Sequence, residues 1–283
     1  MRRVISGLIN RPSNVIALGI IVLVVFLAIF APWIAPYPPE DQPFDGLSPE
    51  GAPLPPSLEY WLGTDTLGRD LLSRLLFGAR TSLVIGLVSN GIAVMIGMAV
   101  GIVAGYISGF FGNLMMRFTD LMMAFPALLL AIVLASLLRP SLWIVAMVIA
   151  LVNWVQVARI VYTETRGLVA RDFITAQESM GASHLRIVLK HIAPHLLPTA
   201  IVWGTLGIAT TVLLEATLSF LGVGVQPPQA SWGNIIYESQ SYFQSAPWLV
   251  FVPGSIILAT ALAFNIVGDS LRNLLDPTQR GRG

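Results

Sequence analysis

The sequence contains no cysteine, a single lysine and three histidines, and only 11% of its 283 residues are charged. The missing cysteine excludes disulfides, thiolate catalysis and cysteine-ligated metals. A soluble domain carries about 25% charged residues, so this chain has too few charges to cover a water-facing surface. A net charge of +1 also argues against a nucleic-acid-binding protein. The composition therefore predicts an all-α membrane protein that has the lipid bilayer, and no nucleic acid, as its partner.

Sequence motifs for catalysis and nucleotide binding are absent as well. No Gly-x-x-x-x-Gly-Lys-Ser/Thr pattern is present, so the chain has no P-loop of its own. Neither His-Glu-x-x-His nor Gly-x-Ser-x-Gly occurs. His191 and His195 are four residues apart, but Pro194 interrupts their helix and no carboxylate is near. We therefore predict no catalytic residue, no metal site and no bound cofactor, which disfavours a membrane-embedded enzyme.

Long stretches without charge predict six membrane-spanning helices, because a span needs about 20 mostly apolar residues. The first stretch is centred on 15–34, and the next three are 81–116, 120–139 and 139–159. The fifth begins after Lys190 and is interrupted by Glu215, and the sixth is 238–269. The second stretch is long for one helix, and Gly105, Gly109 and Gly112 are expected to mark its exit. The glycines of this stretch are also expected to permit close helix packing: Gly86, Gly91, Gly97, Gly101 and Gly105.

The distribution of lysine and arginine predicts the orientation. With six spans, 12 of the 16 basic residues fall on one face, which is therefore expected to be cytoplasmic together with both termini. These residues are Arg2, Arg3, Arg11, Arg117, Arg159, Arg166, Arg171, Arg186, Lys190, Arg272, Arg280 and Arg282.

Four segments follow from these spans. Residues 1–35 form an N-terminal tail and the first span, and residues 36–80 an extracytoplasmic loop. Eight prolines between 35 and 56 make that loop an extended covering segment. Residues 81–277 form a five-helix core that includes a cytoplasmic loop at 166–195, and residues 278–283 a cytoplasmic tail.

The loop at 166–195 predicts two short helices. Asp172 is expected to cap a helix that begins at Phe173, and Gly181 to end it in the left-handed conformation. Ser183 is expected to cap a second helix, which Pro194 ends or kinks. Such short helices are marginal alone, so they dock either on the inner helix ends of this chain or in a groove on a partner.

Charges inside the membrane are candidates for function. Glu215 is expected near the outer end of the fifth span, where water reaches it. It either pairs at the interface or lines the pathway as a gate. Asp120 and Asp269 are expected at span boundaries, which leaves no clear proton site for a secondary carrier. The aromatic stretch 232–248 is either an interfacial segment or a contact for an outer partner.

The spacing from Thr175-Ala176-Gln177 through Gly181 to Pro194 resembles the EAA loop of binding-protein-dependent ABC importer permeases. Thr175, Gln177 and Ala193 depart from the Glu, Ala and Leu that are usual there. Four other segments resemble the peptide/nickel branch of these permeases, so that the similarity covers about residues 15–277. They are 61–74 with 78–83, 215–228 with 231–233, 263–272 and 275–277.

This resemblance implies a six-helix type I ABC importer permease fold and a C-type transmembrane subunit in a bacterial inner membrane. It implies as partners a homologous B-type permease, an extracytoplasmic solute-binding protein and two ATPase subunits that carry ATP and Mg²⁺. The implied solutes are di- or oligopeptides, with nickel chelates or glutathione as alternatives, and an ATP-independent carrier as a further one. The implied ATPase-coupling residues are Thr175, Ala176, Gln177, Glu178, Ser179, Met180, Gly181, Ala182, Ser183, Arg186 and Pro194.

Overall fold

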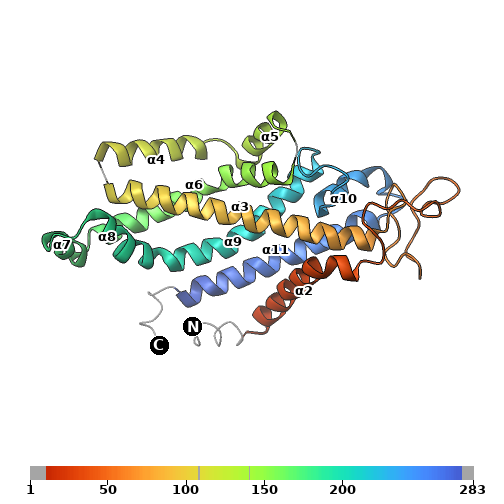
Figure 1. Ribbon diagram of the computed structural model, residues 1–283, viewed down its shortest axis with the longest axis horizontal. Coiled ribbons are helices and arrows are strands. Elements are labelled where there is room, and N and C mark those ends of the chain that lie inside the picture. Colours follow the sequence, from red (N-terminus) through yellow and green to blue (C-terminus); the bar gives the residue numbers. More distant parts are fainter. Residues whose placement is uncertain (1–10, 108, 140, 276–283) are drawn as a thin grey trace.

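The computed structural model describes residues 11–107, 109–139 and 141–275 as an elongated bundle of helices (Figure 1). The terminal arginines at 2, 3, 280 and 282 and the motif residues 276 and 277 lie outside the described residues. The helices in order are α2 (Pro12–Ile34), α3 (Leu71–Ile107), α4 (Gly109–Met123), α5 (Ala127–Leu137), α6 (Leu142–Val169), α7 (Asp172–Ser179), α8 (His184–Ile187), the π-helical η1 (Val188–Ile192), α9 (Ala193–Phe220), α10 (Trp232–Glu238), the 3₁₀ turn η2 (Gln240–Tyr242) and α11 (Trp248–Leu275).

Five helical segments are long and apolar enough to cross a membrane. They are α2, α3, α6, the continuous stretch α8–η1–α9 and α11. The pair α4–α5 makes a sixth span when its two helices, bent by 87°, are counted as one. On that count the described helices agree with the six predicted spans. Helices can cross lipid because they satisfy their backbone hydrogen bonds internally.

The second span differs from its expected limits. The structure begins α3 at Leu71, before the charge-free stretch that starts at Thr81, and ends it at Ile107. Its 37 residues extend over about 55 Å, more than the roughly 30 Å hydrocarbon core. The first turns can therefore lie outside the lipid, where Arg74 is tolerated. Gly109, at φ +69°, makes the expected exit turn.

The third span was expected as one helix between residues 120 and 139, and this is wrong. α4 ends at Met123 and α5 begins at Ala127. Pro126, at φ −57° and ψ 124°, precedes α5 in an extended conformation. Proline has no N–H to continue the helical ladder, so the chain turns there.

The centre of the bundle is the contact between α3 and α6. Cβ atoms added at Gly97 and Gly101 would lie 2.6 Å from Val157 Cβ and from the Ala158 carbonyl oxygen, respectively. The absent side chains let the two backbones approach closely. A Cβ atom added at Gly91, on the same helix, would meet nothing within 4 Å, so close packing explains only part of the glycine series.

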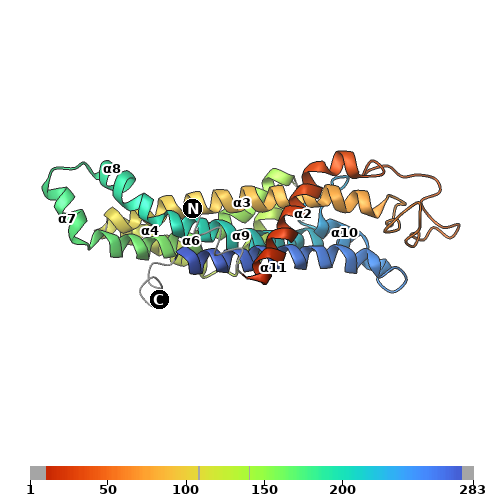
Figure 2. The same cartoon turned by 90° about the horizontal axis from the view of Figure 1, so that it is seen from below.

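The first span lies at the periphery and crosses α11 obliquely (Figure 2). The buried residues of α2 are small or polar: Asn14, Ala17, Ala28 and Ala31. Ser270 of α11 donates a 2.8 Å hydrogen bond to Asn14 Oδ1. The remaining surface of α2 is apolar and exposed, as expected for a helix that faces lipid.

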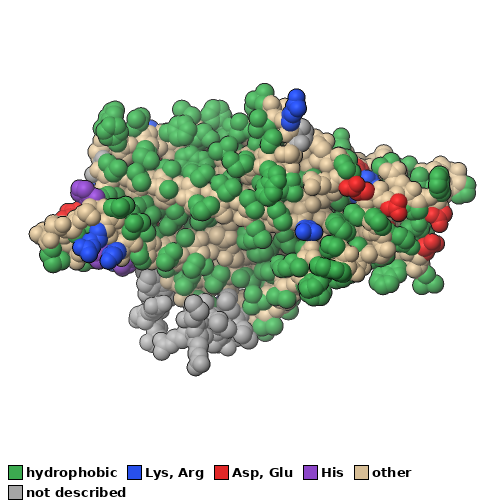
Figure 3. All heavy atoms as spheres, in the orientation of Figure 1, with side chains coloured by type: hydrophobic (Ala, Val, Ile, Leu, Met, Phe, Trp, Pro, Cys, Tyr) green, Lys and Arg blue, Asp and Glu red, His purple; other side chains and the backbone are tan. Residues whose placement is uncertain are grey.

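The two ends of the bundle differ in charge. In Figure 3, acidic side chains gather at the end formed by the loop 36–70 and α10, and basic and histidine side chains at the end formed by α7 and α8. Hydrophobic side chains cover the middle. These ends are called the α10 end and the α7 end below.

Candidate functional site

The predicted coupling segment forms a protruding tip at the α7 end (Figure 1). Arg171 occupies the N-cap position and makes no side-chain capping bond. The expected cap, Asp172, is instead the first helical residue, where its carboxylate complements the positive end of the helix dipole. Gly181, at φ +78°, closes α7 as predicted, and its N–H donates to the Glu178 carbonyl at 2.9 Å.

The second short helix leads directly into the fifth span. Ser183 Oγ accepts a 3.4 Å hydrogen bond from the Arg186 N–H, which confirms the predicted cap. Pro194 was expected to end or kink this helix, but the helix continues through η1 into α9. The π-helical turn at Val188–Ile192 changes the hydrogen-bond register just before Pro194, whose missing N–H then falls at a position that needs no partner.

The tip is anchored by few residues. Ile174 in α7 is buried, as are Ile187 and Ile192, and these three pack in one cluster with Val161 and Leu196. Two side-chain contacts add to this anchor. Tyr106 Oη lies 2.8 Å from His184 Nδ1, and the Phe173 and His195 rings stack at 5.6 Å. No sequence signal pointed to either contact.

The rest of the tip faces away from the bundle. Of the predicted coupling residues, Thr175, Ala176, Glu178, Ser179, Met180, Gly181, Ser183 and Arg186 are exposed, and Gln177 and Ala182 are half-buried. Met180 and Leu185 are 70% and 68% exposed, respectively. Pro194, also exposed, lies in α9 rather than in the tip. Apolar side chains that this chain leaves uncovered favour docking on a partner over docking on its own helix ends.

Glu215 lies in α9 near the α10 end, and the expectation that water reaches it is wrong. Its side chain is fully buried. Ser82 of α3 and Ser219 of α9 each donate a 2.8 Å hydrogen bond to the carboxylate. No basic residue in the described part of the chain forms an ion pair with Glu215. The carboxylate therefore joins α3 to α9 through hydroxyl groups.

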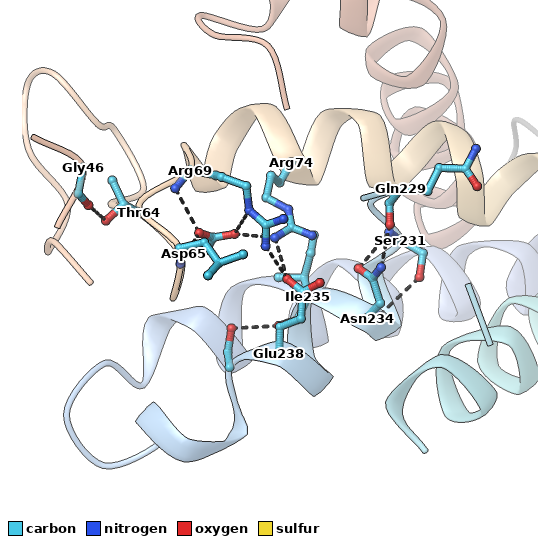
Figure 4. Close-up of polar contacts among 12 residues, drawn as sticks. Gly46, Thr64, Asp65, Arg69, Arg74, Gln229, Ser231, Asn234, Ile235 and Glu238 are labelled. Atoms are coloured by element: carbon cyan, nitrogen blue, oxygen red, sulfur yellow. Dashed lines mark hydrogen bonds and ion pairs between the residues drawn. The ribbon is translucent and has the colours of Figure 1, made fainter. Parts of the chain in front are cut away.

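The sequence reasoning missed an ionic network at the α10 end (Figure 4). Arg69 and Arg74 both pair with Asp65 and with Glu238 of α10. Arg69 Nη2 lies 2.5 Å and Arg74 Nη1 2.6 Å from Glu238 Oε2. Arg74 is fully buried, and no hydrogen-bond partner among the described residues reaches its Nε and Nη2 atoms.

Burial controls the ionisation of Glu238. The pKa of its carboxyl is raised from the ordinary 4.5 to about 7: removal from water is the largest cause, Arg69 lowers the pKa, and the negative charge of Asp65 raises it. A carboxylate beside two arginines normally has a lowered pKa, so desolvation outweighs the favourable charges here. The only sequence signal was the pair of arginines in the otherwise acidic segment 37–74.

The aromatic stretch 232–248 is buried at its start, whereas Tyr237 and Phe243 further along are 48% and 50% exposed. Trp232 and Ile235 of α10 are buried, with 1% of each exposed. Ser231 caps α10 and forms a capping box with Asn234, whose Nδ2 also donates to the Gln229 carbonyl at 2.6 Å (Figure 4). α10 thus folds into the bundle end, where it presents Glu238 to the arginines.

The loop 36–70 is tied to this network. Thr64 Oγ1 donates a 2.6 Å hydrogen bond to the Gly46 carbonyl and accepts one of 2.8 Å from the Leu54 N–H. Asp65 Oδ1 accepts from the Arg69 N–H at 2.9 Å. The proline-rich segment therefore packs as an ordered cover on the α10 end.

Comparison with known families agrees with this architecture. Residues 97–281 match the family described as "Binding-protein-dependent transport system inner membrane component". Residues 1–56 match the "N-terminal TM domain of oligopeptide transport permease C". The chain belongs to this permease family. It is a multi-pass inner membrane subunit of an ABC transport system and not an enzyme, and such a system also includes an ATPase and a binding protein.

Individual relatives cover almost the whole chain. The permease is 41% identical to the di/tripeptide transport system permease protein DppC of Pseudomonas aeruginosa, over 90% of this chain and 84% of the relative. It is 38% identical to the dipeptide transport system permease protein DppC of Alkalihalophilus pseudofirmus, over 99% and 90%. It is 39% identical to the glutathione transport system permease protein GsiD of an Escherichia coli O6 strain, over 92% and 85%.

A solved structure shares the fold. The inward-facing MetNI methionine ABC transporter contains a chain that superposes with a TM-score of 0.59, at 19% sequence identity. The match covers 73% of this permease and 98% of that chain. At this identity the likeness concerns the fold alone, and it confirms the predicted fold of an ABC importer permease.

Proposed function

We propose that this chain is the C-type transmembrane subunit of an ATP-driven importer of di- or oligopeptides. The observation that carries the proposal is the 41% and 38% identity, over nearly the full chain, to permeases named for di/tripeptides and dipeptides. A glutathione permease has similar identity, which makes glutathione the second candidate solute.

The proposed complex contains this chain, a homologous B-type permease, two ATPase subunits and an extracytoplasmic solute-binding protein. The absence of a P-loop supports separate ATPases, which supply ATP and Mg²⁺. The exposed tip supports a docking role, because Ile174 is the buried residue of α7 and the residues from Thr175 to Ser183 are exposed except for the half-buried Gln177 and Ala182.

The proposed orientation sets the α7 end in the cytoplasm. The excess of lysine and arginine assigned to that face supports it, as does the gathering of basic side chains there (Figure 3). Both termini are then cytoplasmic. The ordered cover at 36–70 lies on the outer face, where a binding protein arrives.

In the proposed mechanism, closure of the ATPases moves the α7 tip, and the tip moves α6 and α9. α7 follows α6 after two residues, and α8 and η1 continue into α9 without a break. A displacement of the tip is therefore transmitted along two spans, which can switch the permease between inward- and outward-facing states. Glu215 is a candidate gate, because its carboxylate connects α9 to α3 near the outer end.

Purification of the chain with its co-expressed neighbours tests this function. We expect a complex of two permeases and ATPases whose ATP hydrolysis rises with a peptide-loaded binding protein. Uptake of labelled dipeptide and labelled glutathione into proteoliposomes separates the two candidate solutes. A lone chain that moves solute without ATP contradicts the proposal.

A further inference from the structure

A cavity of about 690 Å³ lies at the α7 end, between the last turns of α6, the first turns of α9 and the end of α11. Its volume falls in the range of small-molecule sites, about 300–1,000 Å³. Most coupling residues named above lie in the α7–α8 tip and do not line this cavity. Neither the family match nor the coupling role assigns it a ligand.

The polar part of the cavity wall carries an excess of positive charge. Arg171, just after the end of α6, and Arg272 in the last turn of α11 both line it, together with His195. Glu164 is the acidic residue of the wall, and its Oε2 accepts a 2.6 Å hydrogen bond from Thr199. Along the described segments of the chain, neither arginine has an ion-pair partner. Two guanidinium groups and one carboxylate give the wall a net charge of +1, which one anionic group would neutralise.

The remaining wall is apolar. Leu168 of α6 lines it together with Leu196, Val202, Trp203 and Leu206 of α9. Arginines at helix ends that face water need no ligand. Arg171 and Arg272, however, line the same cavity as these apolar side chains. A ligand that satisfies both parts has an anionic head and an apolar tail. A free peptide offers charges at both ends and leaves the apolar wall uncovered.

We propose that this cavity binds an anionic phospholipid of the cytoplasmic leaflet. The phosphate lies against Arg171 and Arg272, whose planar guanidinium groups suit phosphate oxygens. The acyl chain lies along Trp203 and Leu206, which keep part of their surface exposed. Basic pockets between spanning helices at the cytoplasmic side bind anionic headgroups in this way. The inference uses the proposed orientation, and its test involves no transport.

Trp203 supplies the measurement. The purified complex is placed in phosphatidylcholine nanodiscs that contain an increasing fraction of dibrominated phosphatidylglycerol, which quenches tryptophan fluorescence. The difference in fluorescence between the native chain and the Trp203→Phe variant gives the quenching of Trp203. We expect stronger quenching by brominated phosphatidylglycerol than by brominated phosphatidylcholine at equal bromine content. Each basic residue near a membrane surface contributes about fivefold to anionic-lipid binding. The half-saturating lipid fraction should therefore rise about fivefold in Arg171→Gln or Arg272→Gln.

Matched variants keep the test independent of folding. Arg171→Lys with Arg272→Lys retains both charges and should keep most of the preference. Arg117→Gln removes an exposed arginine of α4 that does not line the cavity and should change nothing. Equal quenching by both lipids, or an unchanged preference in Arg171→Gln/Arg272→Gln, overturns the proposal. Reversal of the quenching by inorganic phosphate means that a free anion occupies the site, and it overturns the lipid assignment too.

Discussion

Arg74 donates a 2.6 Å hydrogen bond to Glu238, a residue 164 positions later in the chain. The contact joins the first turn of α3 to the last residue of α10, and Asp65 and Arg69 complete the network. Both arginines are withdrawn from water, and a buried charge is costly unless an opposite charge pairs with it. These ion pairs therefore hold the loop 36–70 and α10 together.

Replacement of Arg74 should destabilise the outer end strongly. Arg74→Met leaves the buried carboxylates of Asp65 and Glu238 short of one partner, which costs about 3–5 kcal/mol for a buried pair. Arg80→Met, which removes an exposed arginine of the same helix, is the control. Thermal unfolding of the detergent-solubilised complex measures both, and equal unfolding temperatures would contradict the assignment.

Glu238 should make stability depend on pH. Its pKa is raised in the folded protein from 4.5 to about 7, so between these values only the folded state holds the proton. The contribution of Glu238 to stability should therefore be fully present below about pH 4.5 and be lost as pH rises through about 7. Glu238→Gln should flatten the curve of unfolding temperature against pH over this window. A slope that persists unchanged in this variant assigns the effect to another group.

The glycines of α3 should differ sharply in their tolerance of a methyl group. Gly101→Ala sets a Cβ atom 2.6 Å from the Ala158 carbonyl oxygen and should cost about 1–3 kcal/mol through overpacking. Gly91→Ala meets nothing within 4 Å and should stabilise the helix by about 0.5–1 kcal/mol. Unfolding temperatures of the two variants decide this, and the same sign for both would argue against close α3–α6 packing.

Changes in the α7 tip should uncouple ATP hydrolysis from transport. Ala176→Trp adds bulk to an exposed position, and Gly181→Val forces a β-branched residue to φ +78°. Both should reduce peptide uptake at least tenfold while membrane insertion and thermal stability stay near the native values. Ala176→Ser, with one added oxygen, is the control. Native uptake in Ala176→Trp would remove the tip from the coupling path.

Glu215 should show separate structural and functional effects. Glu215→Ala removes the acceptor of the Ser82 and Ser219 hydroxyls, and each unsatisfied buried group costs about 1–3 kcal/mol. Glu215→Gln keeps an acceptor oxygen and should remain assembled. If Glu215 gates the pathway, uptake should change in the assembled Gln variant. Native uptake there, with reduced stability in Glu215→Ala, would leave Glu215 a purely structural role.

The amino-acid sequence by itself determined the class, the number of spans and the short helices of the tip, but not the break in the third span between Met123 and Ala127. A bilayer admits backbone only where its hydrogen bonds are satisfied within the segment, so a long charge-free stretch suffices to predict a helix. The roles of Gly181 and Ser183 could also be predicted, because a few adjacent residues decide where a helix begins or ends.

Only the tertiary structure decided which residues meet. The pairing of Arg74 with Glu238 depends on how α10 re-enters the bundle, which no periodicity of either segment records. The burial of Glu215 depends in part on the Ser82 hydroxyl, which another span supplies. The face of α3 that meets α6 decides why a side chain at Gly101 would clash while one at Gly91 would not. Hydrophobicity in lipid selects helices but not their neighbours, so these contacts follow from packing and not from the sequence pattern.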